Sequence, residues 1–147
     1  MKLVVVTSPA TDAGKTFLAT GLTEVAAYNN YKTVYVDLDK PVGDSLRVFG
    51  LRHERDIPTI TTYMNYGIED YAKTPAGGYI LPKPDNINEK FSAYDAEKLV
   101  MSLQQNEFDI AVIDLGASLE TSFWKSFVEQ ANITLLVTDC DDKALYR

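Results

Sequence analysis

The sequence is poor in the residues that form disulfides and soft-metal sites. Its 147 residues include one cysteine, Cys140, and one histidine, His53. A single cysteine excludes an internal disulfide and a cysteine-rich metal site, and a single histidine excludes a histidine cluster for zinc. Any metal that the protein binds is therefore expected to be a hard ion held by oxygen ligands.

Long apolar runs and an excess of cationic residues are also missing. No run approaches the roughly 20 apolar residues that span a bilayer. The start, MKLVVVTSP, lacks the longer apolar region and the cleavage site of a secretory signal, so a cytoplasmic protein without a transmembrane segment is expected. With 14 Lys and Arg against 21 Asp and Glu, the net charge is −7. That charge disfavours the nucleic-acid backbone and anionic membranes, and we expect no nucleic-acid partner.

What the sequence does contain is an alternation of short apolar runs with helical patterns. The predicted strands are Leu3–Thr7, Thr33–Asp37, Ile110–Asp114 and Ile133–Thr138, with a weaker candidate at Tyr79–Leu81, and the predicted helices are Lys15–Tyr28, Asp95–Gln104 and Glu120–Ala131. The strands lack strict polar alternation, which indicates burial on both faces. Strands that alternate with helices predict an α/β fold with a mainly parallel central sheet flanked by helices, here as a single domain over residues 1–147.

Residues 6–18, VTSPATDAGKTFL, join the first predicted strand to the first predicted helix. A loop that ends in Gly14-Lys15-Thr16 between a strand and a helix is typical of a P-loop, whose amides converge on phosphate oxygens. In that geometry Gly14 lets the backbone approach the phosphates, Lys15 neutralises the β- and γ-oxygens, and Thr16 places its hydroxyl on Mg²⁺. The predicted nucleotide-binding residues of this loop are Pro9, Ala10, Thr11, Asp12, Ala13, Gly14, Lys15, Thr16 and Phe17.

Carboxylates follow two other predicted strands. Asp37 and Asp39 end the second strand in VYVDLDKPVGD, and Asp114 ends a later strand in FDIAVIDLG, with Gly116 close behind. Since parallel sheets bind ligands beyond the carboxyl ends of their strands, these residues are expected to face the same crevice as the P-loop. Two carboxylates there can orient a magnesium-bound water and an attacking water. Each pattern alone also fits an ordinary acidic loop after a buried strand.

Order and spacing together resemble the deviant P-loop ATPases of the ParA/MinD type, in the SIMIBI class, and most closely their CpaE-like branch, associated with pilus assembly and protein positioning. The matching stretches are Gly14-Lys15-Thr16, VYVDLDKPVGDSLRVFGL, GYILPKP, FDIAVIDLG and ITLLVTDCDDKALYR. The resemblance implies a three-layer P-loop NTPase fold, ATP or ADP with Mg²⁺ as cofactors, and a family domain that extends further. We therefore expect residues 1–147 to be the N-terminal part of a longer domain.

The resemblance also implies roles for individual residues. It assigns phosphate binding to Lys15, Mg²⁺ binding to Thr16 with support from Asp37 and Asp114, and water activation to Asp39. The expected catalytic residues are thus Asp39 and Lys15, and Gly116 would sense the γ-phosphate.

The loop departs from the family pattern, Lys-Gly-Gly-x-Gly-Lys-Ser/Thr. Ala10 stands where the family has a lysine that reaches the partner's phosphates across a dimer, and Thr11 and Asp12 replace the two glycines. Pro9 removes a backbone donor, and Asp12 adds a negative charge to a loop meant for phosphate. The loop is also similar to that of dethiobiotin synthetase, which works without the signature lysine. Ala10 therefore predicts slow hydrolysis.

Three functions fit these observations. The leading one is an ATP-binding molecular switch with slow hydrolysis, whose nucleotide state controls homodimer formation or docking to an unidentified protein partner in positioning or in pilus or secretion assembly. The second is a pseudo-ATPase scaffold or binding module that has lost turnover. The third is a dethiobiotin-synthetase-like ligase, which the loop permits but the Asp37-Leu38-Asp39 segment with Gly43-Asp44 argues against.

Overall fold

The computed structural model describes residues 1–9, 14–39, 46–51, 58–67, 71–84, 91–116 and 121–138. In chain order its elements are β1 (Lys2–Thr7), α1 (Lys15–Tyr28), β2 (Thr33–Asp37), α3 (Ile60–Tyr66), β3 (Tyr79–Pro82), α4 (Ala93–Gln105), β4 (Ile110–Asp114), α5 (Thr121–Gln130) and β5 (Ile133–Leu136). All eight elements expected from the sequence are present, with small shifts at several ends. Helix α3 is an addition that the apolar pattern did not predict.

The five strands form one sheet in the order β3-β2-β4-β1-β5, and every neighbouring pair is parallel. The register places Asp114 at the end of β4 opposite Asp37 of β2 and opposite Val6 of β1. The carboxyl ends of three adjacent strands, β1, β4 and β2, therefore lie side by side at one end of the sheet. The loops that follow these strands begin at the same end.

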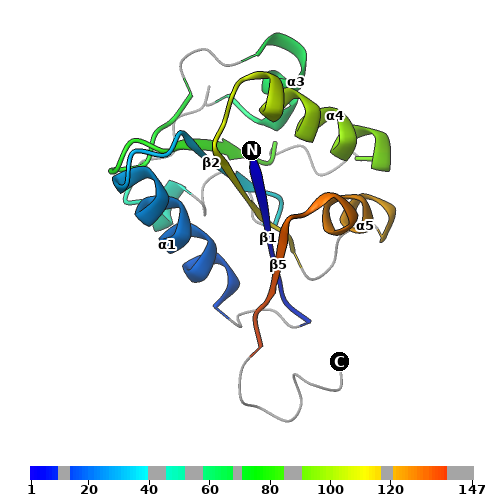
Figure 1. The fold of residues 1–147 in the computed structure, drawn as a ribbon, viewed down its shortest axis with the longest axis horizontal. Helices are drawn as coiled ribbons and strands as arrows, with labels where there is room; N and C mark the ends of the chain where they lie inside the picture. The colour runs from blue at the N-terminus through cyan, green and yellow to red at the C-terminus, as the bar shows by residue number, and fades with distance from the viewer. Residues whose placement is uncertain are drawn as a thin grey trace.

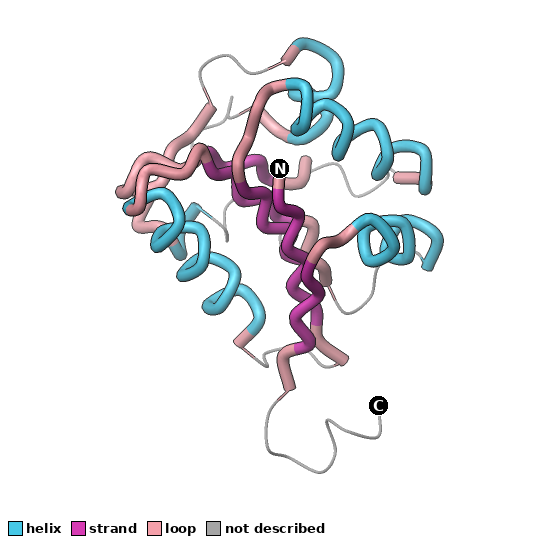
Figure 2. The backbone as a smooth tube through the Cα atoms, viewed as in Figure 1, coloured by secondary structure: helices cyan, strands magenta, loops and turns pink. Residues whose placement is uncertain are grey.

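Helices cover both faces of the sheet (Figure 1; Figure 2). Helix α1 packs on one face, and α3, α4 and α5 lie on the other. Two apolar cores result: one contains Leu3, Val5, Leu99, Leu103, Phe123 and Phe127, and the other contains Val6, Ala19, Tyr35, Leu46, Phe49, Ile80 and Val112. Strands β2 and β4 are buried on both faces, as their apolar sequences predict. The expected three-layer α/β architecture is confirmed.

Strand β5 departs from the predicted burial. Ile133 is 50% exposed and Leu136 is 65% exposed, because within the described residues β5 pairs with β1 alone and forms the edge of the sheet. An apolar groove of about 330 Å³ runs between α1 and strands β1, β4 and β5, and Leu22, Val25 and Leu135 are among its lining residues.

Local sequence signals set the helix ends. Ser92 and Asp95 form a capping box at the start of α4, in which the Ser92 hydroxyl accepts from the Asp95 amide and the Asp95 carboxylate accepts from the Ser92 amide. Thr59 and Thr62 form the corresponding pair at the start of α3. None of the helices in the described ranges combines the length and the apolar character needed to cross a bilayer.

Phe127 tests the packing of α5 on the sheet. Its ring is fully buried and meets Phe123 edge to face, with 4.9 Å between the ring centroids. Replacing Phe127 with Ala should lower the free energy of unfolding by about 3–5 kcal/mol, because it removes buried apolar area and leaves a cavity. The exposed Tyr94 of α4 is a control whose replacement by Ala should stay within about 0.5 kcal/mol of wild type. Urea denaturation measures the free energy of unfolding of both variants. Equal decreases for Phe127→Ala and Tyr94→Ala would contradict the burial of Phe127 between α5 and the rest of the core.

Candidate functional site

Lys15 is the first residue of α1, and the residue before it fixes where the helix begins. Gly14 is the N-cap, with φ 89°, a left-handed conformation that glycine adopts without strain. Its carbonyl accepts the first helical hydrogen bond from the Leu18 amide at 3.0 Å. Thr20 donates its hydroxyl to the Thr16 carbonyl at 2.8 Å, which binds the first turn to the second. These two bonds define the first turn of α1, so the position of Lys15 on the helix is fixed.

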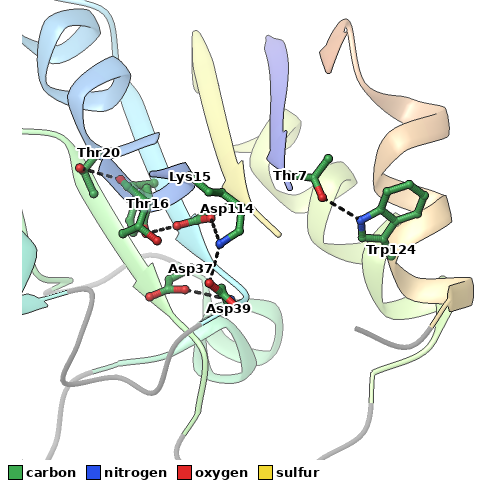
Figure 3. A network of polar contacts seen from close by, with 9 residues as sticks. Thr7, Lys15, Thr16, Thr20, Asp37, Asp39, Asp114 and Trp124 are labelled. Atoms are coloured by element: carbon green, nitrogen blue, oxygen red, sulfur yellow. Dashed lines mark hydrogen bonds and ion pairs between the residues drawn. The ribbon is translucent and has the colours of Figure 1, made fainter. Parts of the chain in front are cut away.

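The Lys15 ammonium lies between two carboxylates (Figure 3). Its Nζ atom donates to Oδ2 of Asp39 at 2.5 Å and lies 3.4 Å from Oδ1 of Asp114. Burial of the side chain lowers the pKa of Lys15, but the hydrogen bond to Asp39 and the charges of Asp114 and Asp39 outweigh it, so the pKa lies above its ordinary value. Lys15 therefore stays protonated and places a positive charge at the carboxyl ends of β2 and β4.

Asp114 is fully buried at the end of β4. Burial raises the pKa of its carboxyl, while the charge of Lys15 and hydrogen bonds from the Thr16 and Tyr35 hydroxyls oppose that rise. The Tyr35 hydroxyl donates to Oδ2 at 2.8 Å. The Thr16 contact is visible in Figure 3, where the first residues of α1 lie against the end of β4. A buried carboxylate needs such donors and a nearby cation to stay ionised.

Asp37, Asp39 and Gly116 complete the cluster. Asp37 is fully buried, and its Oδ1 accepts a hydrogen bond from the Asp39 amide at 2.9 Å, which shapes the turn after β2. Gly116 lies directly against that turn: a Cβ atom at this position would lie 2.5 Å from Oδ1 of Asp39 and 3.3 Å from its Cα. A side chain at position 116 would therefore force the Asp39 carboxylate to move and would press on the backbone of the turn after β2.

Helix α5 is tied to the root of the loop that follows β1. The indole Nε1 of Trp124 donates to Oγ1 of Thr7 at 3.2 Å, and Trp124 packs against the apolar core beneath α5. Thr7 is buried at the last position of β1. Thr7, at the end of β1, is thus hydrogen-bonded to α5.

The donor set fits magnesium that arrives with a phosphate ligand. Within the described ranges, no three His, Cys, Asp or Glu side chains form a group that could hold a metal by themselves, and Oδ1 of Asp114 is a buried oxygen that accepts no hydrogen bond. Mg²⁺ is commonly held by one or two carboxylates together with substrate phosphates and water. Thr16 and Asp114 offer a hydroxyl and a carboxylate side by side, which meets that need.

The structure brings together six of the residues singled out in the sequence: Lys15, Thr16, Asp37, Asp39, Asp114 and Gly116. Their functional roles stay predictions. Pro9 is exposed, and the Phe17 side chain is 84% exposed to solvent. Ala10, Thr11, Asp12 and Ala13 lie outside the described residues. Tyr35 is the residue that sequence analysis missed, because its contact with Asp114 depends on β2 lying beside β4.

The sequence matches no family model and no curated protein, but solved structures resemble the fold. MinD from Aquifex aeolicus, in the MinC:MinD cell division complex, has a TM-score of 0.75 at 20% identity and is matched over 99% of this chain and 59% of its own. An ATP complex of a McdA variant from Cyanothece has a TM-score of 0.76 at 20% identity, over 99% of this chain and 59% of its own. Cobyrinic acid a,c-diamide synthase from Mycobacterium smegmatis, with a bound ATP analogue and magnesium, has a TM-score of 0.78 at 18% identity, over 98% of this chain and 62% of its own.

The chain therefore has the fold of the P-loop ATPases of the ParA/MinD type, which confirms the fold class expected from the sequence. It spans between 59% and 62% of the length of these three solved structures.

Gly116 offers a direct test of the packing at the site. Replacing Gly116 with Ala should lower the free energy of unfolding by about 1–3 kcal/mol, because the added methyl overlaps Asp39. At Gly21, inside α1, an added methyl group would have no atom within 4 Å, so Gly21→Ala should leave stability unchanged or raise it. The gain expected in the control is up to about 1 kcal/mol. Urea denaturation of both variants decides; a Gly116→Ala protein as stable as Gly21→Ala would show that Asp39 does not pack against position 116.

Proposed function

We propose that the chain is an ATP-binding molecular switch of the ParA/MinD/CpaE type with slow ATP hydrolysis. The observation that carries the proposal is the position of Lys15, at the first residue of α1 and within 3.4 Å of carboxylates from two neighbouring strand ends. A helix amino end with an adjacent lysine is a general anion site, and phosphate is the anion that it suits best here. The shared fold with MinD and McdA supports this proposal.

Nucleotide binding would change the partner of Lys15. A phosphate oxygen and the Asp39 carboxylate compete for the same ammonium, so Lys15 would leave Asp39 for the phosphates. Magnesium, when bound, supplies the positive charge that balances the phosphates and the carboxylates, and Thr16 and Asp114 would hold it. Because Gly116 has no side chain, the Asp39 carboxylate has room beside the loop after β4.

Hydrolysis would then depend on Asp39. Its carboxylate, released from Lys15, can accept a hydrogen bond from the attacking water and hold that water in line. Lys15 stabilises negative charge on the transferred phosphoryl group. Ala10 stands where the related ATPases have a second lysine, so this chain lacks a cation that would act on the transition state. Slow turnover follows from that loss.

The switch would report its state through association. The sequence resemblance to the CpaE-like branch favours protein positioning or pilus or secretion assembly as the setting, and one protein of the same fold is described in a complex with a partner, MinC. The proposal for this chain is that the nucleotide state controls self-association or docking to a protein partner.

A pseudo-ATPase is the second candidate, and the 2.5 Å contact between Lys15 and Asp39 favours it. If that ion pair is stronger than any contact with phosphate, Lys15 serves only to neutralise the buried carboxylates. The chain would then be a scaffold that keeps the fold without binding nucleotide. Calorimetry with ATP and Mg²⁺ separates the two functions, since only the first predicts heat of binding.

Lys15 provides the binding test. The wild-type chain should bind Mg-ATP or Mg-ADP with a dissociation constant on the order of micromolar to millimolar. Replacing Lys15 with Ala should abolish binding, because it removes the positive charge at the helix start. Lys125, exposed on α5 and paired with Glu129, is the control, and Lys125→Ala should bind as wild type does. Unchanged binding by Lys15→Ala would place the nucleotide elsewhere.

Turnover provides the second test. Wild type should hydrolyse ATP well below about 1 s⁻¹, since a cation supplied by a partner contributes about 10³–10⁵ in rate to related reactions and Ala10 cannot supply it. Asp39→Ala should hydrolyse more slowly still, while its affinity for nucleotide does not fall. Steady-state phosphate release at several protein concentrations measures both. Brisk hydrolysis by wild type, or an Asp39→Ala variant as active as wild type, would refute the assigned roles.

A further inference from the structure

Tyr35 lies at the centre of β2, two residues before Asp37. Its side chain is fully buried on the α1 side of the sheet. Strands β2 and β4 pair so that Tyr35 lies opposite Val112 and Asp37 lies opposite Asp114. Because side chains alternate along a strand, Tyr35 faces the same side as these two carboxylates. Its hydroxyl can therefore reach Asp114 diagonally across the strand pair.

The hydrogen bond fixes one oxygen of Asp114. The Tyr35 hydroxyl donates to Oδ2 at 2.8 Å, and Oδ1 is the oxygen that lies 3.4 Å from Nζ of Lys15. Burial, followed by the charges of Asp37 and Asp114, raises the pKa of Tyr35 well above its ordinary value, so the phenol stays protonated and able to donate. The terminal torsion of an aspartate is soft, so the orientation of its carboxylate depends on bonds of this kind.

The ring of Tyr35 is held independently of its hydroxyl. Phe49, also buried, meets it edge to face, with 5.3 Å between the centroids and 76° between the planes. Such aromatic pairs restrict ring orientation and add to apolar burial. Packing therefore aims the hydroxyl at Asp114, and a phenylalanine at position 35 would keep the same ring contacts.

We propose that Tyr35 is a positioning residue of the nucleotide site: it holds Oδ2 of Asp114 so that Oδ1 faces Lys15 and would be available to the magnesium that accompanies a nucleotide. This inference rests on the proposed nucleotide-binding function. Groups that orient a metal ligand in this way commonly change metal affinity by about 10–100-fold when they are removed. A purely structural role for Tyr35 would affect stability alone.

The test is the magnesium dependence of nucleotide affinity in Tyr35→Phe. Calorimetry gives the dissociation constant of ADP with Mg²⁺ and with EDTA, and the ratio of the two reports the contribution of the metal. In Tyr35→Phe the constant with Mg²⁺ should rise about tenfold or more, while the constant in EDTA changes by less than about twofold. Tyr63→Phe is the matched control, because the buried Tyr63 also loses one hydrogen bond, from Asn106 Nδ2 at 3.0 Å, far from the site. The control ratio should equal that of wild type.

Asp114→Ala supplies a second variant that keeps the tyrosine but removes the acceptor of its hydrogen bond. In that background the additional change Tyr35→Phe should no longer alter the ratio, because the two residues act through one hydrogen bond. An unchanged ratio in Tyr35→Phe, with stability lowered as in Tyr63→Phe, would overturn the proposal and leave nucleotide binding intact. Failure of wild type to bind ADP under both conditions would instead refute the proposed function, and this inference with it.

Discussion

The ammonium of Lys15 between two carboxylates is the interaction on which the site depends. Strands β2 and β4 are parallel and place Asp37, Asp39 and Asp114 at their carboxyl ends. Asp37 and Asp114 are fully buried. Carboxylates so placed stay ionised only with a cation and hydrogen-bond donors close by, since transfer of an unpaired charge out of water is strongly unfavourable. Lys15, the first residue of α1, supplies that cation. The turn after β2, the end of β4 and the first turn of α1 are thereby bound to one another by a single side chain.

The proposed function implies that two anions, the Asp39 carboxylate and a phosphate, would compete for Lys15. Under the proposed function, a phosphate oxygen that binds the Lys15 ammonium would release Asp39 from Lys15. The absence of a side chain at Gly116 leaves room for the Asp39 carboxylate. Lys15 would bind the ligand, and in the structure the same residue stabilises the carboxyl ends of β2 and β4 through its ion pairs with Asp39 and Asp114. Under the proposed function, a change that strengthens the ion pair between Lys15 and Asp39 would therefore weaken the affinity for phosphate.

Sequence patterns predicted the parts of the fold that local chemistry decides. The bounds of α1 and β2 agree with the structure because Gly14 sets the start of one and an apolar run defines the other. Helix α3 was missed because it is short and is held by tertiary packing, with Ile60 and Tyr63 buried against α4. The contact of Tyr35 with Asp114 could not be predicted, since it requires β2 to lie beside β4 and not beside β1. Strand order is a property of the whole chain, and no motif near Tyr35 encodes it.

The hydrogen bond between Trp124 and Thr7 has an optical consequence. The chain contains one tryptophan, so its long-wavelength emission comes from a single ring. The indole of that tryptophan donates a hydrogen bond to Thr7, the last residue of β1, and the chain continues from Thr7 toward Lys15. Indole fluorescence responds to the polarity and hydrogen bonding around the ring, and a shift of Thr7 would change both. The protein therefore carries an intrinsic fluorophore at the root of its candidate site, which makes slow rearrangements there visible in stopped-flow traces without any added label.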